Sequence, residues 1–129
     1  MKKIYLVGGT VRDKLMNQPN YDTDYVAVGF NFNDFLHLQQ VGKDFPVFLT
    51  DDGSELALAR KERKITLGYN GFDVETLNVT LEEDLSRRDI TINSMAYDET
   101  NKKLIDPFNG QKDIQNKVLK HTSNAFVAL

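Results

Sequence analysis

Two aspartates two residues apart stand before an apolar run and could hold a divalent cation. Asp22 and Asp24 precede Tyr25 to Val28, a run that predicts a strand. On a strand, residues i and i+2 point to the same face, so the two carboxylates would sit side by side and need a counterion. Magnesium takes oxygen ligands, and it can activate a hydroxyl and stabilise a pyrophosphate leaving group. Taken alone, Asp-x-Asp is more often an acidic surface loop.

A glycine pair that follows a strand and opens a helix could bind phosphate. Gly8 and Gly9 come directly after the strand predicted at Ile4 to Val7. Glycine lets the backbone approach a phosphate closely, and a helix N-terminus favours an anion. Arg12, in the first turn of the helix, could add a charge-assisted contact. The alternative is a strand-turn-helix junction that needs glycine for its geometry alone.

The glycine turn and the aspartate pair together are far less common than either feature alone. A short helix joins them, and a β-α-β connection of this length brings both to the same end of a sheet. A triphosphate cradle would then lie beside a metal pair, as nucleotidyl transfer requires.

Paired arginines follow a capping box that starts a helix predicted over residues 81–94. Arg87 and Arg88 could bind phosphate or sugar. Asp89 and Asn93 would share one face of that helix, where they could orient an arginine or contact a ribose. The alternative is an ordinary charged helix with an internal salt bridge.

Short strands alternate with short helices along the chain, which predicts one mixed α/β domain. Strands are predicted at 4–7, 24–28, 45–50, 55–60, 72–77, 95–98 and 104–106, and helices at 10–16, 33–40, 81–94 and 110–117. Thr10 is expected to cap the first helix, and residues 64–71, with two glycines, are predicted to form a mobile loop.

The composition indicates a globular protein that does not grip long nucleic acid by itself. Of the 129 residues, 40% are hydrophobic and 27% are charged, which is typical of one soluble domain. No apolar run is long enough for a membrane span, and the absence of cysteine excludes disulfides and thiolate metal sites. A cytoplasmic location is therefore expected. The net charge of −3 argues against extensive RNA binding by this segment alone.

Taken in order, these stretches resemble the signature motifs of class II tRNA nucleotidyltransferases and bacterial poly(A) polymerases, which belong to the DNA polymerase β-like superfamily. The motif-bearing stretches are 6–13, 22–24 and 87–93. Others resemble CCA-adding enzymes of gammaproteobacterial type, namely 40–49, 57–64, 68–72 and 105–110. The resemblance covers nearly the whole chain. It implies a nucleotidyltransferase head (catalytic) domain over residues 1–129, built as an α/β (α+β) fold with a small mixed sheet flanked by short helices.

The resemblance also implies an activity and a set of site residues. The reaction would be attack by a tRNA 3′-hydroxyl on the α-phosphate of CTP or ATP, with release of pyrophosphate. The residues implied to bind the nucleotide are Gly8, Gly9, Arg12, Arg88, Asp89 and Asn93, and those implied to hold catalytic Mg²⁺ are Asp22 and Asp24. The loop at 64–71 would match the family's flexible loop, which helps it switch between adding C and adding A.

The sequence departs from the family pattern after the head. The family continues into a neck with a base-selecting motif and then into a body and a tail that hold tRNA, and none of these is expected within residues 1–129. A non-catalytic nucleotide-binding module that needs a partner or regulates a full-length enzyme is therefore the alternative. Self-association or a separate body-like partner is compatible with either reading. Transfer to another acceptor, such as a protein or a free nucleotide, is a third reading. Glu75 is a candidate third metal carboxylate by strand alternation, although Asp73 to Glu75 could equally be a solvated edge.

Overall fold

The computed structural model describes residues 2–19, 23–42, 47–64, 72–75 and 79–122. For residues 62–64 and 72–75 it describes the backbone alone. Asp22, most of the predicted loop at 64–71 and the C-terminal residues 123–129 therefore lie outside the described residues.

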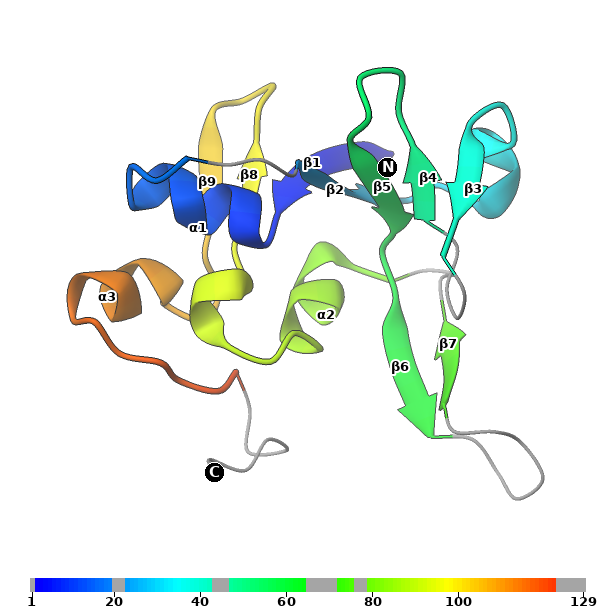
Figure 1. The fold of residues 1–129 in the computed structure, drawn as a ribbon. Coiled ribbons are helices and arrows are strands. Elements are labelled where there is room, and N and C mark those ends of the chain that lie inside the picture. The colour runs from blue at the N-terminus through cyan, green and yellow to red at the C-terminus, as the bar shows by residue number, and fades with distance from the viewer. Residues whose placement is uncertain (1, 20–22, 43–46, 65–71, 76–78, 123–129) are drawn as a thin grey trace.

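The main element is a seven-stranded mixed sheet in the order β3-β4-β5-β2-β1-β8-β9 (Figure 1). Its strands are β1 (Lys3–Val7), β2 (Asp24–Val28), β3 (Gln39–Val41), β4 (Val47–Leu49), β5 (Glu55–Leu58), β8 (Ala96–Asp98) and β9 (Lys103–Ile105). Among the described strand pairs of this sheet, only β2 and β5 are parallel, and the other neighbours are antiparallel. The mixed sheet expected from the resemblance is confirmed.

A second, two-stranded sheet leaves the main sheet after β5. It is the hairpin of β6 (Lys61–Lys64) and β7 (Phe72–Glu75), which projects away from the main sheet (Figure 1). The sequence predicted a strand in place of β7 but none in place of β6, because the four charged residues of β6 hide the alternation that marks a half-buried strand.

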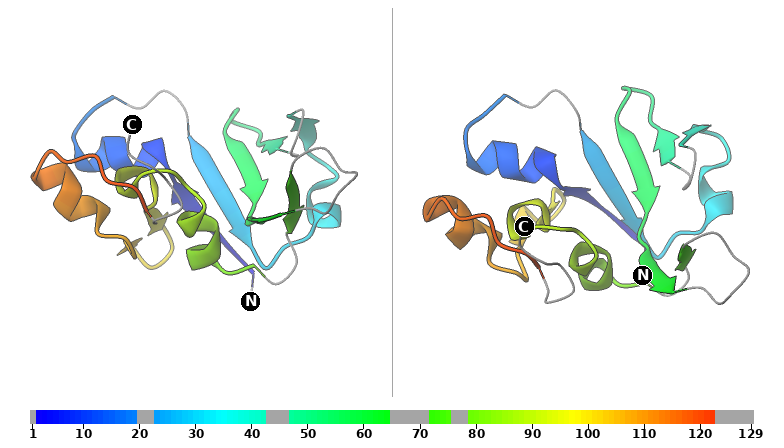
Figure 2. Two further views of the ribbon diagram at one scale, coloured as in Figure 1. Left: turned by 90° about the horizontal axis from the view of Figure 1, so that it is seen from below. Right: turned by 60° about the horizontal axis from the view of Figure 1, so that its bottom comes forward.

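Within the described residues, three short α-helices and two 3-10 turns flank the sheet. They are α1 (Gly9–Leu15), α2 (Leu81–Ser86), α3 (Gly110–Gln115), η1 (Phe32–Phe35) and η2 (Thr91–Asn93). Both α1 and α3 contact η2, and they gather at the end of the sheet that carries β8 and β9 (Figures 1 and 2).

The two faces of the sheet are covered by different elements. On one face Val7 and Val26 pack with Leu85 of α2, which is fully buried. On the other face Phe48 of β4 packs with Phe35 of η1. Side chains alternate along a strand, so residues two apart from Val26 in β2 share the face that α2 covers.

The helix predicted at 33–40 is wrong. One 3-10 turn, η1, forms there, and the chain then extends into the edge strand β3. Asn31 caps the turn, since its side chain accepts from the backbone N–H of Asn33 at 3.1 Å. The single turn is enough to bury Phe35. Leu36 is 62% exposed, so burial of its side chain does not favour a longer helix.

The helix predicted at 81–94 is too long. Its start is confirmed, since Thr80 and Glu83 form the capping box, but α2 ends at Ser86. The Asp89 carboxylate accepts the backbone N–H of Ile90 at 2.8 Å, and Ile90 is extended and forms a β-bridge with His121. A side chain that binds the adjacent backbone competes with a helix. Asp89 and Asn93 therefore do not share a helical face.

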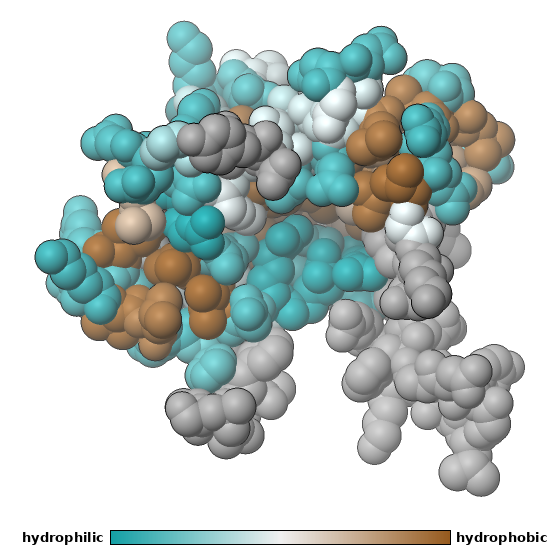
Figure 3. Space-filling model, in the orientation of Figure 1, coloured by the Kyte–Doolittle hydropathy of each residue, from teal (hydrophilic) through white to brown (hydrophobic). Residues whose placement is uncertain are grey.

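Hydrophobic side chains are unevenly spread over the surface. In Figure 3 they gather near α3 and, at the opposite end, near η1 and β3, with hydrophilic residues between. The exposed ones include Leu15, Met16, Phe32, Leu36 and Leu119. None of the helices within the described residues has the length and apolar character to cross a bilayer.

A partly buried ion pair joins β1 to the β8–β9 hairpin and should make the free energy of unfolding depend on pH. Lys3 forms an ion pair with Asp98, which also accepts from Asn101 Nδ2 at 2.8 Å. Bonding to Lys3 is the main cause that lowers the pKa of Asp98 from 3.8 to about 2. A pKa lowered in the folded state adds stability above pH 3.8, and this stability is lost as pH falls towards 2.

Asp98→Asn is therefore expected to lower the melting temperature at pH 7, and the gap from wild type should shrink as the pH approaches 2. Thermal unfolding followed by circular dichroism at several pH values measures this difference in melting temperature. Glu99→Gln, at the exposed neighbouring position, should show no such change in the gap. A gap that is constant with pH would contradict the assignment to this ion pair.

Candidate nucleotide and metal site

The glycine turn and Asp24 lie at the same end of the sheet. Because β1 and β2 are antiparallel, the end of β1 at Val7 lies beside the start of β2 at Asp24. Thr10 does not cap α1, whose N-cap is Gly8. Instead its hydroxyl accepts the backbone N–H of Asp24 at 3.1 Å, which ties the first turn of α1 to β2. The predicted closeness of turn and carboxylate is thus found for Asp24, while Asp22 lies outside the described residues.

Each of the two glycines lies beside a guanidinium group. Gly8 has φ +67°, a conformation that residues with a Cβ rarely adopt. A Cβ at Gly8 would lie 3.5 Å from Nη1 of Arg88, and a Cβ at Gly9 would lie 3.2 Å from Nη2 of Arg12. The turn therefore places bare backbone beside two positive charges, which suits a polyanion.

Arg12 is held in place by two neighbours. Its Nε donates to Asp13 at 3.0 Å, and its Nη1 donates to Oδ1 of Asn93 at 2.9 Å. Of the two roles left open for Asn93, orienting an arginine is the one that the geometry displays. Asp89 is exposed and its carboxylate binds the backbone of Ile90, so it is not joined to this group.

A pocket of about 190 Å³ brings carboxylates and arginines together on the face that α2 covers. Its polar lining is Asp24 of β2, Glu55 of β5, Arg87 and Arg88. Asp24 and Glu55 are directly paired in the parallel β2–β5 register, so their side chains leave the sheet on the same face. The pocket thus presents negative groups on the strands and positive groups beyond the end of α2.

Glu55 also lines the pocket, and no pattern in the sequence predicted it. It follows the turn at Asp51 to Gly53 and reads as the first polar position of an ordinary strand. Only the pairing of β5 beside β2 shows its place, and no local pattern encodes that pairing. Glu75, the residue proposed from sequence as a third carboxylate, lies on β7 opposite Lys61, in the other sheet.

Among the described residues no group of three or more His, Cys, Asp or Glu is placed to hold a metal ion. Asp24 and Glu55 supply the hard carboxylate oxygens that magnesium prefers, and arginines opposite them could neutralise phosphates that share the ion. The donor set in the pocket therefore fits a divalent cation bound together with a nucleotide.

Known proteins resemble this chain along nearly its full length. A family described as the poly(A) polymerase head domain matches residues 4–120. The multifunctional CCA protein of Pseudoalteromonas atlantica is 59% identical over 128 residues, which cover 96% of this chain and 31% of that protein. The structure of the Bacillus stearothermophilus CCA-adding enzyme in complex with CTP matches with a TM-score of 0.72 and 30% identity, over 96% of this chain and 30% of that one. The Thermotoga maritima CCA-adding enzyme in complex with tRNA matches with a TM-score of 0.64 and 28% identity, over 95% of this chain and 29% of that one.

The fold and the match over residues 4–120 define a head domain of the poly(A) polymerase type. The chain belongs to the poly(A) polymerase head domain family. It spans about a third of the length of the curated relatives it matches.

Proposed function

We propose that this chain is the catalytic head of a CCA-adding tRNA nucleotidyltransferase that uses CTP and ATP. The observation that carries the proposal is the pocket in which Asp24 and Glu55 face Arg87 and Arg88 beside the Gly8 turn. Negative groups for a cation and positive groups for phosphates, side by side, suit a metal-bound triphosphate. The curated relatives that bear CCA-adding names support the choice of reaction.

The site residues then take the following roles. Asp24, with Asp22 and Glu55, would hold Mg²⁺. The bound ion would activate the attacking hydroxyl and stabilise the leaving group. Arg12, Arg87 and Arg88 are the phosphate-binding groups, and the Gly8-Gly9 turn lets the triphosphate approach the backbone. Asn93 acts through Arg12. Asp89 remains a proposed ribose or nucleotide contact from the family resemblance alone.

The reaction is a substitution at phosphorus. The 3′-hydroxyl oxygen of the tRNA attacks the α-phosphorus of CTP or ATP and forms a new P–O bond. The bond from the α-phosphorus to the bridging oxygen breaks, pyrophosphate leaves, and the hydroxyl proton passes to solvent. Little covalent chemistry falls to the protein, so its task is to position the groups and to offset charge.

Incorporation of labelled CTP and ATP into tRNA that lacks its 3′-terminal CCA tests the proposal. We expect magnesium-dependent transfer by a protein that contains this head, and magnesium-dependent binding of CTP and ATP by the chain itself. Binding without transfer by the chain alone would favour a module that needs a body-like partner, and adding the remaining two thirds of a relative in trans would test that. Absence of any triphosphate binding would refute the proposal.

A further inference from the structure

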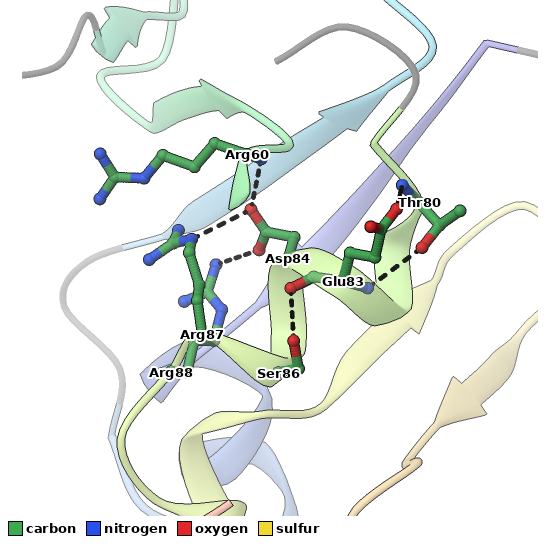
Figure 4. Close-up of polar contacts among 7 residues, drawn as sticks. All are labelled: Arg60, Thr80, Glu83, Asp84, Ser86, Arg87 and Arg88. Atoms are coloured by element: carbon green, nitrogen blue, oxygen red, sulfur yellow. Dashed lines mark hydrogen bonds and ion pairs between the residues drawn. The ribbon is translucent and has the colours of Figure 1, made fainter. Parts of the chain in front are cut away.

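The carboxylate of Asp84 is the most deeply buried charged group among the described residues, and the proposed reaction gives it no role. Asp84 has no solvent exposure. It lies on α2, beside the side chains of Arg87 and Arg88 that line the pocket (Figure 4). Burying a carboxylate is costly unless charged or hydrogen-bonding partners compensate it. The partners that compensate it therefore indicate what it does.

Both pocket arginines contact this one carboxylate. Nη2 of Arg88 lies 3.0 Å from Oδ1 of Asp84, and Nε of Arg87 lies 3.4 Å from Oδ2. The spacings i+3 and i+4 at the end of α2 allow one acid to reach both side chains. In Figure 4 both guanidinium groups lie beside the Asp84 carboxylate.

The third partner of Asp84 comes from the segment that joins the main sheet to the projecting hairpin. Oδ2 accepts the backbone N–H of Arg60 at 2.9 Å. Arg60 stands between β5, which carries Glu55, and β6, the first strand of the projecting hairpin. One carboxylate therefore fixes both arginines relative to the strand that supplies a pocket carboxylate.

Arg88 keeps donors for a ligand while Asp84 holds it. The side chains of Arg87 and Arg88 are 19% and 20% exposed, so both are largely enclosed and still open to the pocket. Nε of Arg88 is buried and has no hydrogen-bond partner among the described residues. A guanidinium has five N–H donors, so the bond from Nη2 of Arg88 to Asp84 orients that group and leaves other donors of Arg88 for phosphate oxygens.

We propose that Asp84 is a positioning residue that holds Arg87 and Arg88 in the orientation in which they bind the triphosphate. An arginine side chain otherwise loses considerable rotamer freedom when it binds a ligand. With Asp84 in place, much of that ordering is complete before the nucleotide arrives. This inference rests on the proposed function, because it concerns nucleotide binding at the same pocket.

The direction in which the CTP affinity changes in one variant distinguishes a positioning role of Asp84 from a purely electrostatic effect of its charge. Asp84→Asn keeps the shape of the side chain and removes a negative charge next to a site for a polyanion. By Coulomb attraction alone, the variant would bind CTP more tightly. If Asp84 positions the arginines, the variant binds more weakly, roughly tenfold, because a charge-assisted contact to each arginine is lost.

Isothermal titration calorimetry with CTP and with pyrophosphate, both in the presence of magnesium, measures the two affinities on folded protein. Glu82→Gln is the matched control, since it removes the same charge from an exposed position of the same helix, and its affinity should stay at the wild-type value. Weaker binding by Asp84→Asn at an unchanged circular dichroism spectrum supports the proposal. Unchanged or tighter binding overturns it.

A second variant decides the case if Asp84→Asn does not fold. Arg88→Lys keeps Asp84 and the pocket charge but replaces a planar, oriented group with a flexible ammonium. We expect CTP binding to weaken roughly tenfold, and wild-type affinity in this variant would overturn the proposal. If the wild-type chain bound neither CTP nor pyrophosphate, the proposed function itself would fail, and this inference would fail with it.

Discussion

Replacement of Asp24 by alanine is expected to reduce nucleotidyl transfer roughly a thousandfold or more and to remove the magnesium dependence of CTP binding. Asp24 lines the pocket beside Glu55 and opposite the arginines. The stabilisation that a bound metal gives to developing charge is worth several kcal/mol, and each 1.4 kcal/mol or so is a factor of ten in rate. Transfer to CCA-lacking tRNA and titration of CTP with and without magnesium measure the two effects.

The fold should survive this change. The tie between β2 and α1 uses the backbone N–H of Asp24, not its carboxylate, as donor to Thr10. Asp51→Ala is the matched control, because it removes an exposed aspartate from the nearby β4–β5 turn, and it should transfer at the wild-type rate. Magnesium-dependent transfer that persists in Asp24→Ala would remove Asp24 from the metal site.

Gly110→Ala is expected to destabilise the domain by about 1–3 kcal/mol, the usual cost of overpacking a filled site. Gly110 is the first residue of α3 and is buried. A Cβ there would lie 2.5 Å from the backbone oxygen of Thr91 and 3.0 Å from Cγ and Sδ of Met95. The oxygen belongs to the backbone of η2, so the clash cannot be relieved by rotating a side chain.

Chemical denaturation of wild type and variant measures this difference in the free energy of unfolding. Gln111→Ala, one residue further along α3 and exposed, should change stability by less than about 0.5 kcal/mol. Equal stability of Gly110→Ala and wild type would show that α3 and η2 can separate without cost.

Local signals in the sequence correctly predicted the elements with strong boundaries. The apolar run from Tyr25 to Val28 formed β2, and the capping box at Thr80 started α2. The helix after Gly8-Gly9 formed as α1. Each of these rests on contacts between residues near in sequence, which a single stretch of chain can encode.

Where the prediction failed, contacts distant in sequence decided the structure. Residues 33–40 have helical apolar content, yet β3 forms there because Gln39 to Val41 can pair with β4 at the sheet edge. The helix predicted to 94 stops early because Ile90 pairs with His121. A side-chain bond from Asp89 to the backbone of Ile90 reinforces that stop.

The sequence by itself determined the glycine turn, the position of Asp24 at the start of a strand and the presence of paired arginines, because each is a local pattern of residue types. The tertiary structure alone decided that Glu55 stands beside Asp24 and that Asp84 joins the arginines to the backbone of Arg60. Strand register and the docking of a helix on a sheet depend on packing between segments far apart in the chain. Such packing leaves no signature in any one of the segments that it joins.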